Sequence, residues 1–431
     1  MPGQVSGKYR RVRRYGVWST AVIAAIAGAA MGTAARVAPS WVATWTAAMQ
    51  PPFPRKPGRF DNETVRLFVR TSIGGDRVRL VLSNRFGRTP LRIGALRVAR
   101  AGDDLRIDPA GDRVVTIGGQ RAVTIAPGAT VTSDPVDVSV AAGARLAVSI
   151  YFPGPTPVTT THVLALQTGQ VARGNRATDF PAAPDRTISD RPFLAAIDVA
   201  GDPARAVYVF GDSGVDGDGS TEEADHRWTD YLAARYSDER GGRAVAMLNL
   251  GLIGNRLLRD SPGVAPYFSS LGEAALRRFG NELPAATRGA CLVVRLGLND
   301  IGFGGIYPRG SRPVTAPELI AGYRALILAA HWRAMRVIGT TITPFEGDET
   351  PGYYTPAKDK VRNQINRWMR TAGAFDGLAD LDLVLRDPAH PSRLLPRYDS
   401  GDHLHVNDQG YKLSADATDL SRCFAGMTKK G

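Results

Sequence analysis

Apolar and polar positions alternate along the first half of the chain. Between Trp41 and about Arg205, several stretches have apolar residues at every second position, as around residues 65–70 and 77–82 and in Arg145–Phe152. This period of two is typical of β-strands with one buried face. A Gly-Gly-Asp turn at 74–76 separates the first two stretches, so we predict that they pair as a hairpin. Many short strands with Gly- and Pro-rich turns predict a β-sandwich or jelly roll.

The pattern changes after about residue 205. Continuous apolar runs follow, at Val207–Phe210, Val245–Gly251, Cys291–Gly297 and Met335–Ile342. Such runs are expected for strands buried on both faces of a parallel sheet. Between them, stretches such as His226–Tyr236 and Ala316–Trp332 have the character of helices. Alternating strands and helices predict an α/β domain whose ligand chemistry lies at the carboxyl ends of the strands.

Length and composition bound this interpretation. A chain of 431 residues is too long for one hydrophobic core, which predicts two domains. We place a β-sandwich-like domain at 38–200 and the α/β domain at 201–431. An apolar content of 43% and a charged content of 22% suit a globular protein, and they argue against a disordered chain or a multi-span membrane protein.

The first 37 residues predict export. Lys and Arg residues at positions 8–14 precede Val17–Ala35, an uncharged run rich in Ala, Val, Ile and Gly that ends in small residues. This order is that of a signal peptide, with cleavage expected near Ala34 or Ala35. An uncleaved anchor is the alternative, because the run approaches the roughly 20 residues that span a bilayer. The protein is therefore expected to be secreted, or membrane-anchored with its folded domains outside.

The charge and the cysteines add little further. The formal net charge is +13, and the six basic residues of the first 37 account for part of it, leaving +7. We see no Lys/Arg cluster interleaved with aromatic residues and predict no nucleic-acid partner. Export would permit a disulfide between Cys291 and Cys423, but two buried thiols are an equal alternative. No metal-binding spacing is present, and no cofactor is predicted. The oligomeric state stays open.

The stretch Val207–Ser220 contains a candidate nucleophile, Ser213. Its Gly-Asp-Ser-Gly segment occurs in trypsin-like proteases, but these need a catalytic His upstream, and His162 lacks the residues that surround one. The G-x-S-x-G elbow of α/β-hydrolases needs glycine where this chain has Val215. A calcium loop starting at Asp216 would have Arg227 at the position of its bidentate Glu. These three interpretations therefore fail.

Four blocks in order point elsewhere. Gly211–Ser213, Gly254, Gly297–Asp300 and Asp402–His405 follow one another along the chain, three of them at the ends of predicted strands. With these blocks residues 205–425 resemble the SGNH, or GDSL, family of esterases and acylhydrolases. The resemblance implies a three-layer α/β/α domain with a five-stranded parallel sheet and a serine ester hydrolase activity. The β-rich segment resembles the leader domain of exported bacterial members, some of which deacylate plant polysaccharides.

The resemblance also implies the roles of single residues. Ser213 would be the nucleophile, His405 its general base, and Asp402 the carboxylate that orients the imidazole, which matches the chemistry of a serine triad. The backbone N–H groups of Ser213 and Gly254 and the side-chain amide of Asn299 would form the oxyanion hole. His403 is the rival histidine, but only His405 fits the Asp-x-x-His spacing.

Substrate choice is open at this stage. Many relatives have serine where this chain has Ile253, and a polar step where it has Gly214–Val215. Both departures affect the pocket rather than the reaction. We expect short acyl esters, such as acetyl groups on a polysaccharide, as substrates. Lipid or aryl esters are the alternative, and a carbohydrate-binding or adhesion protein with a vestigial hydrolase domain is a further one.

Overall fold

The computed structural model describes residues 40–54, 58–201, 206–238, 245–261, 270–283, 290–307 and 311–424. The predicted export signal at 1–37 lies outside these residues. Residues 39–431 form one compact unit, so the domain boundary near residue 200 stays a prediction. No helix in the described ranges has the length and apolar character that crossing a bilayer requires.

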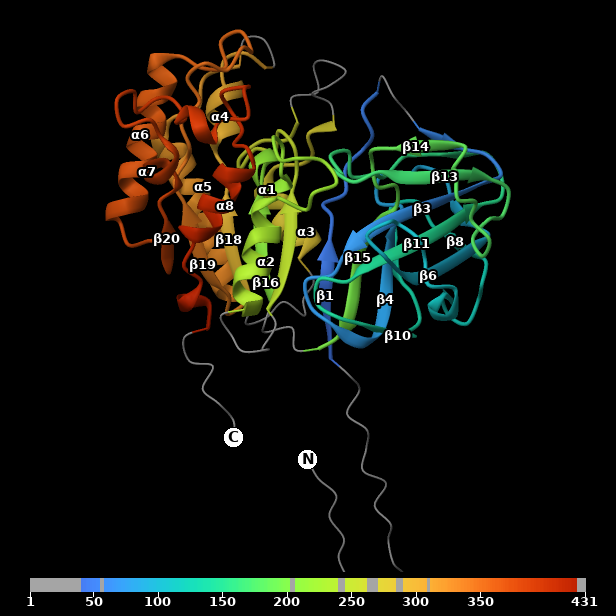
Figure 1. The fold of residues 1–431 in the computed structure, drawn as a ribbon. Helices are drawn as coiled ribbons and strands as arrows, with labels where there is room; N and C mark the ends of the chain where they lie inside the picture. The colour runs from blue at the N-terminus through green and yellow to red at the C-terminus, as the bar shows by residue number, and fades with distance from the viewer. Residues whose placement is uncertain are drawn as a thin grey trace, which may run out of the picture. The chain divides into compact units, whose positions relative to one another are not determined.

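Two antiparallel sheets make up the β-rich part of the chain (Figure 1). The first has the order β1 (Trp41–Thr46), β15 (Leu194–Ala200), β4 (Gly75–Ser83), β10 (Val136–Val140), and β9 (Thr130–Thr132) also pairs with β4. The second has the order β14 (Arg186–Ile188), β13 (Gly169–Arg173), β3 (Glu63–Arg70), β11 (Arg145–Phe152), β6 (Ala95–Ala101), β7 (Arg113–Val114). Short pairs join β2 (Arg59–Phe60) to β12 (Thr156–Pro157) and β5 (Leu91–Ile93) to β8 (Val123–Ile125).

The predicted hairpin between residues 65–70 and 77–82 is wrong. Strand β3 pairs with β11 and β13, whereas β4 pairs with β10 and β15, so the chain crosses from one sheet to the other after Arg70. The apolar residues of both strands meet in one buried cluster, which includes Val65, Leu67, Val69, Val78, Leu80 and Leu82. Alternation in the sequence reveals which side chains are buried. It does not reveal whether two such strands are neighbours in one sheet or face each other from two sheets, because the same side chains are buried in both cases. Here Thr44 of β1 holds the crossing, because its hydroxyl donates to the carbonyl of Ile73 (2.7 Å).

The second part of the chain is the predicted parallel sheet. Its order is β17 (Ala246–Gly251), β16 (Ala206–Gly211), β18 (Cys291–Arg295), β19 (Arg336–Thr340), β20 (Gly377–Ala379), and all neighbours are parallel. The helices are α1 (Ser213–Asp216), α2 (Trp228–Asp238), α3 (Ala275–Glu282), α4 (Leu298–Phe303), α5 (Ala316–Trp332), α6 (Pro356–Thr371), α7 (Leu381–Leu385) and α8 (Asp408–Asp416). Helix α5 has the predicted bounds, because Glu318 accepts a hydrogen bond from the backbone N–H of Thr315 and caps the first turn.

Helices cover both faces of this sheet (Figure 1). Successive side chains of a strand point to opposite faces. Tyr208 and Phe210 of β16 lie in the cluster that includes Phe279 of α3, Tyr323 of α5 and Met369 of α6. Val207 and Val209 lie in the cluster that includes Trp228 of α2, Leu381 of α7 and Tyr411 of α8. The three-layer α/β/α prediction is therefore confirmed, and so is the preceding β-rich region.

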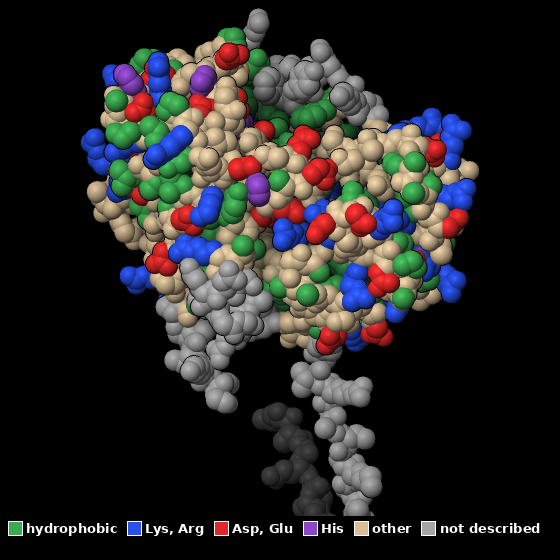
Figure 2. Space-filling view, in the orientation of Figure 1, with side chains coloured by type: hydrophobic (Ala, Val, Ile, Leu, Met, Phe, Trp, Pro, Cys, Tyr) green, Lys and Arg blue, Asp and Glu red, His purple; other side chains and the backbone are tan. Residues whose placement is uncertain are grey.

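The structure also answers whether the two cysteines are bonded. Cys291 begins β18 and Cys423 lies in the short 3-10 helix η6 (Ser421–Phe424), and a disulfide joins them. This contact fastens the C-terminal segment to the centre of the sheet. On the face shown in Figure 2, basic and acidic side chains are intermixed.

Candidate functional site

The candidate site lies at the carboxyl edge of three neighbouring strands. Gly211 at the end of β16 pairs with Gly251 of β17 and with Arg295 of β18, so the three strands end level with one another. The segments that follow carry Ser213, Gly254 and Asn299. Because parallel neighbours lie about 4.8 Å apart, these segments emerge side by side.

Ser213 begins helix α1 directly after β16. The carboxylate of Asp212 accepts from the backbone N–H of Gly214 (3.1 Å) and caps the helix, and Gly217 ends it in the left-handed conformation (φ 115°). A Cβ at Gly214 would lie 1.5 Å from Nη1 of Arg295, so a larger residue there would require the guanidinium to move. The Arg295 guanidinium thus lies against the backbone next to Ser213, where it also donates to Asp212 (2.5 Å).

The structure brings Ser213, His405 and Asp402 together. Nε2 of His405 lies 2.7 Å from Oγ of Ser213, and Nδ1 lies 2.5 Å from Oδ2 of Asp402. The other oxygen of Asp402 accepts from the backbone N–H of Leu404 and His405. Although burial opposes ionisation, these hydrogen bonds and the charge of His405 hold the pKa of Asp402 well below its ordinary 3.8. An ionised carboxylate, an imidazole and a hydroxyl therefore form one continuous chain.

A second carboxylate lies beside the imidazole. Oδ2 of Asp218 is 3.7 Å from Nε2 of His405. Burial would lower the pKa of His405, but the hydrogen bond that its ring donates to Asp402 and the negative charge of Asp218 outweigh it and raise the pKa above 6.5. Burial also raises the pKa of Asp218 above 3.8. Asp218 lies five positions after Ser213, and in the sequence its spacing suggests only the calcium loop that fails on Arg227.

Asn299 lies in the first turn of α4 and is buried. The hydroxyl of Tyr353 donates to Oδ1 of Asn299 (2.8 Å), and among the described residues Nδ2 has no hydrogen-bond partner. Burial raises the pKa of Tyr353 well above 10, so this hydroxyl stays protonated. The amide therefore has its acceptor end occupied and its donor end available. Nothing in the spacing of the sequence singled out Tyr353, which lies 54 residues from Asn299.

Gly254 adopts a backbone conformation that favours glycine (φ 67°). Its Cβ, if present, would lie 2.5 Å from a methyl carbon of Leu271. The preceding residue, Ile253, donates its backbone N–H to Oδ2 of Asp216 (3.2 Å). The turn at 253–254 is thus held against the helix that carries Ser213.

The remaining candidates of the sequence have other partners. The carboxylate of Asp300 accepts from the backbone N–H groups of Leu257 (2.6 Å) and Leu258 (3.0 Å), and burial raises its pKa to about 6. Nδ1 of His403 binds Asp399 (2.7 Å), and half of its side chain is exposed. Within the described ranges, no cluster of three or more His, Cys, Asp or Glu side chains is arranged to hold a metal ion.

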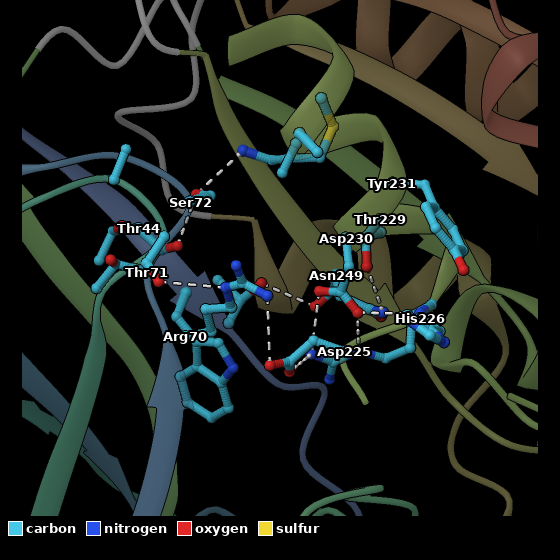
Figure 3. Close-up of a pocket in the computed structure, with 18 of the residues that line it drawn as sticks. Thr44, Arg70, Thr71, Ser72, Asp225, His226, Thr229, Asp230, Tyr231 and Asn249 are labelled. Carbon is cyan, nitrogen blue, oxygen red and sulfur yellow. Dashed lines mark hydrogen bonds and ion pairs between the residues drawn. The ribbon is translucent and has the colours of Figure 1, made fainter. Parts of the chain in front are cut away.

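A cavity between the β-rich part and the sheet does not include these residues. Its volume is about 360 Å³, and it is lined by Thr44, Arg70 and Ser72 on one side and by Asp225, Tyr231 and Asn249 on the other (Figure 3). Ser213, Asp402 and His405 are not among its lining residues. We therefore place the candidate site at the edge of the strands and not in this cavity.

Solved structures of other proteins are similar to this chain at low sequence identity. Among solved structures, the chain is similar to a carbohydrate esterase family 2 enzyme with a carbohydrate-binding domain from Corynascus thermopiles (13% identity, TM-score 0.39, 88% of this chain and 97% of that one). It is also similar to a GDSL-like lipase from Bacteroides thetaiotaomicron (15% identity, TM-score 0.34, 50% of this chain and 85% of that one).

Two further comparisons concern the sequence. A comparison with curated proteins gives no match. The family model described as the GDSL-like lipase/acylhydrolase family matches residues 209–413, which contain Ser213, Gly254, Asn299, Asp402 and His405. Residues 209–413 are therefore similar to the GDSL-like lipase/acylhydrolase family, which supports the serine ester hydrolase activity expected from the sequence.

Proposed function

We propose that Ser213, His405 and Asp402 are a catalytic triad. His405 Nε2 takes the proton of the serine hydroxyl while Oγ attacks the ester carbonyl, and the imidazolium then gives that proton to the departing alcohol. A water molecule activated by His405 releases the acid from the acyl-enzyme. The single observation that carries this proposal is the continuous contact from Asp402 through His405 to Oγ of Ser213, at 2.5 and 2.7 Å.

The same proposal assigns an oxyanion hole. Negative charge develops on the carbonyl oxygen during attack, and hydrogen-bond donors fixed around it lower the barrier. We assign this role to the backbone N–H groups of Ser213 and Gly254 and to Nδ2 of Asn299. Support comes from their position after three level strands and from the available donor end of the Asn299 amide.

For the substrate we propose a short acyl ester of a polar alcohol, with acetyl groups on a polysaccharide as the leading candidate. The surroundings of His405 support a polar alcohol, because the partly exposed carboxylates of Asp218 and Asp348 interact electrostatically with its imidazole. Carboxylates accept hydrogen bonds from sugar hydroxyls, whereas a lipid chain would leave them desolvated and unpaired. Lipid and aryl esters are the competing class.

Turnover of a graded series of esters tests both proposals. We expect hydrolysis of p-nitrophenyl acetate to exceed that of p-nitrophenyl palmitate, release of acetate from acetylated xylan, and no turnover by Ser213→Ala. Preference for palmitate would favour the lipase alternative. Binding of polysaccharide without any turnover by the wild type would favour an adhesion protein with a vestigial hydrolase domain.

We also propose that the protein is exported, and that it is then either secreted or held in the membrane by its N-terminal segment. The residue pattern at 1–37 supports this, and so does the disulfide between Cys291 and Cys423, because disulfides persist in oxidising compartments. Mass spectrometry of the protein recovered outside the cell tests it. A new N-terminus near Ala34 or Ala35 is expected for a cleaved signal, and an intact N-terminus in the membrane fraction for an anchor.

A further inference from the structure

The β-rich part covers the edge of the parallel sheet. Strand β17 is an outer strand of that sheet, and its backbone is bonded by side chains from the β-rich part. The hydroxyl of Thr46 donates to the carbonyl of Asn249 (2.7 Å), and the N–H of Met247 donates to the hydroxyl of Ser72 (3.2 Å), beside the cavity of Figure 3. An outer strand protected in this way cannot pair with another chain, which is a structural role.

One contact across the same boundary reaches the candidate site. His162 lies between β12 and β13 and is buried. Its Nε2 is 2.9 Å from Oδ1 of Asp216, the last residue of the helix that begins with Ser213. The side chain of Asp216 is also buried, so the two groups meet away from water.

The surroundings of the His162 ring identify its protonation state. Nδ1 lies 2.9 Å from the carbonyl oxygen of Ala48, and Nε2 lies 3.1 Å from that of Leu164 as well as close to Asp216. A carbonyl oxygen can only accept, and so can a carboxylate, so both ring nitrogens must donate. The ring is then an imidazolium that forms a buried ion pair with Asp216.

Arg191 and Asp190 also interact electrostatically with the ring. Burial and the positive charge of Arg191 disfavour the imidazolium, but the pKa of His162 is nevertheless raised above 6.5, because the charge and the hydrogen bond of Asp216 favour it. The negative charge of Asp190 acts in the same direction. The electrostatics therefore agree with the assignment made from the hydrogen bonds.

Asp216 also contacts the turn that carries a proposed oxyanion donor. While Oδ1 binds His162, Oδ2 accepts from the backbone N–H of Ile253, the residue before Gly254. The end of β17, just before this turn, also lies close against the helix, since a Cβ on Gly251 would lie 2.1 Å from the backbone nitrogen of Asp216. The carboxylate of Asp216 thus connects a histidine of the β-rich part to the backbone that carries a proposed oxyanion donor.

We propose that His162 is a positioning residue for ester hydrolysis, and that the β-rich part completes the active site through it. The inference depends on the proposed function, because it assigns the Gly254 N–H to the oxyanion hole. Without the imidazolium, the carboxylate of Asp216 is a buried charge with one partner fewer, and it can turn away from Ile253. The turn at 253–254 then shifts relative to Ser213, and the transition state loses a donor.

The main test compares His162→Gln with Thr46→Val. The glutamine can keep one hydrogen bond to Asp216 but has no charge, and the valine removes a hydrogen bond across the same boundary without touching Asp216. We expect His162→Gln to lower kcat for p-nitrophenyl acetate by about 10- to 100-fold, as for a small misplacement of a catalytic group, with KM unchanged. Thr46→Val should keep the wild-type kcat. Wild-type kcat in His162→Gln, or equal losses in both variants, would overturn the proposal.

Two further measurements test the proposal even if His162→Gln does not fold. Asp216→Asn keeps the size of the side chain but presents an amide donor to His162 or to Ile253, and it should reproduce the loss of kcat. Long-range ¹H–¹⁵N NMR of the histidine-labelled wild-type protein at neutral pH should show His162 protonated on both ring nitrogens. A neutral ring, or wild-type kcat in a folded Asp216→Asn, contradicts the proposal.

The variant Ser213→Ala distinguishes a failure of the proposed function from a failure of the positioning role of His162. If this variant keeps its turnover, the proposed function itself is wrong. If Ser213→Ala is inactive and the wild-type serine reacts with a phosphonate ester, while His162→Gln is fully active, only the positioning role is wrong.

Discussion

The hydroxyl of Tyr353 donates a hydrogen bond of 2.8 Å to Oδ1 of Asn299. A phenol held by burial in its protonated form is a donor at every working pH, so it selects one orientation of the amide. The orientation leaves Nδ2 available for a substrate oxygen. Asn299 would then act as an oxyanion donor only because a residue of a distant loop fixes its amide.

Removing that hydroxyl should reduce catalysis without removing the amide. Tyr353→Phe loses a hydrogen bond with a net value of about 1 kcal/mol, which corresponds to roughly a fivefold to tenfold lower kcat. Asn299→Ala loses the donor itself and should lower kcat by roughly 100- to 1,000-fold, with little effect on folding. Steady-state kinetics on the single and double variants check this. Adding Tyr353→Phe to Asn299→Ala should cause no further loss, and additive losses would mean that Tyr353 acts independently.

The charge of Asp218 should set the pH at which the enzyme becomes active. The base form of His405 is the neutral imidazole, and its pKa is raised, so kcat/KM should increase with pH through a value above 6.5. Asp218→Asn removes a negative charge that stabilises the imidazolium, which lowers that pKa and moves the acidic limb to lower pH. Profiles of kcat/KM against pH measure the shift.

A matched control exists on α8. The carboxylate of Asp416 pairs with Lys412 on the exposed surface, so Asp416→Asn should leave the profile unchanged. A profile of Asp218→Asn that coincides with the wild type, or moves to higher pH, would contradict the assignment of Asp218.

Asp402→Asn should inactivate the enzyme while preserving its fold. The amide is the same size but presents no charge to His405, so the imidazolium formed during attack is not stabilised and the tautomer is not fixed. A loss in kcat of about 10⁴-fold is expected from the role of this carboxylate in serine triads. Turnover of p-nitrophenyl acetate measures the loss of activity, and circular dichroism checks that the fold is preserved. The ring of His403 binds Asp399 and not Asp402. His403→Ala should therefore keep most of the activity.

The disulfide should stabilise the fold rather than act in catalysis. It closes a loop of 132 residues between β18 and η6, which in the loop-entropy description contributes about 2–5 kcal/mol to the free energy of unfolding. Replacing Cys291 and Cys423 with alanine should therefore lower Tm, whereas kcat at low temperature should stay near the wild-type value. Thermal unfolding with and without reductant measures the effect in the unmodified chain. An unchanged Tm would show that the link does not constrain the unfolded chain.

Local patterns carried much of the fold and of the candidate site. Continuous apolar runs marked β16, β17, β18 and β19, because a strand covered on both faces needs apolar side chains at every position. A Ser, an Asn and an Asp-x-x-His pair after predicted strands or before the last helix marked the site, because parallel strands end at one edge and bring such loops together. These features depend on neighbours in the sequence or on a shared topology, and the amino-acid order is enough to reveal them.

Contacts between distant segments were decided only by the tertiary structure. The pattern of β3 and β4 is the same whether they pair or face each other, and the structure shows them in different sheets. Tyr353 near Asn299, His162 near Asp216 and Cys291 joined to Cys423 are each separated by more than fifty residues. Such partners carry no local signal, since their positions follow from how the sheets and helices pack. The sequence by itself determined most of the elements and the order of the four candidate blocks, and packing decided which side chains hold those blocks in place.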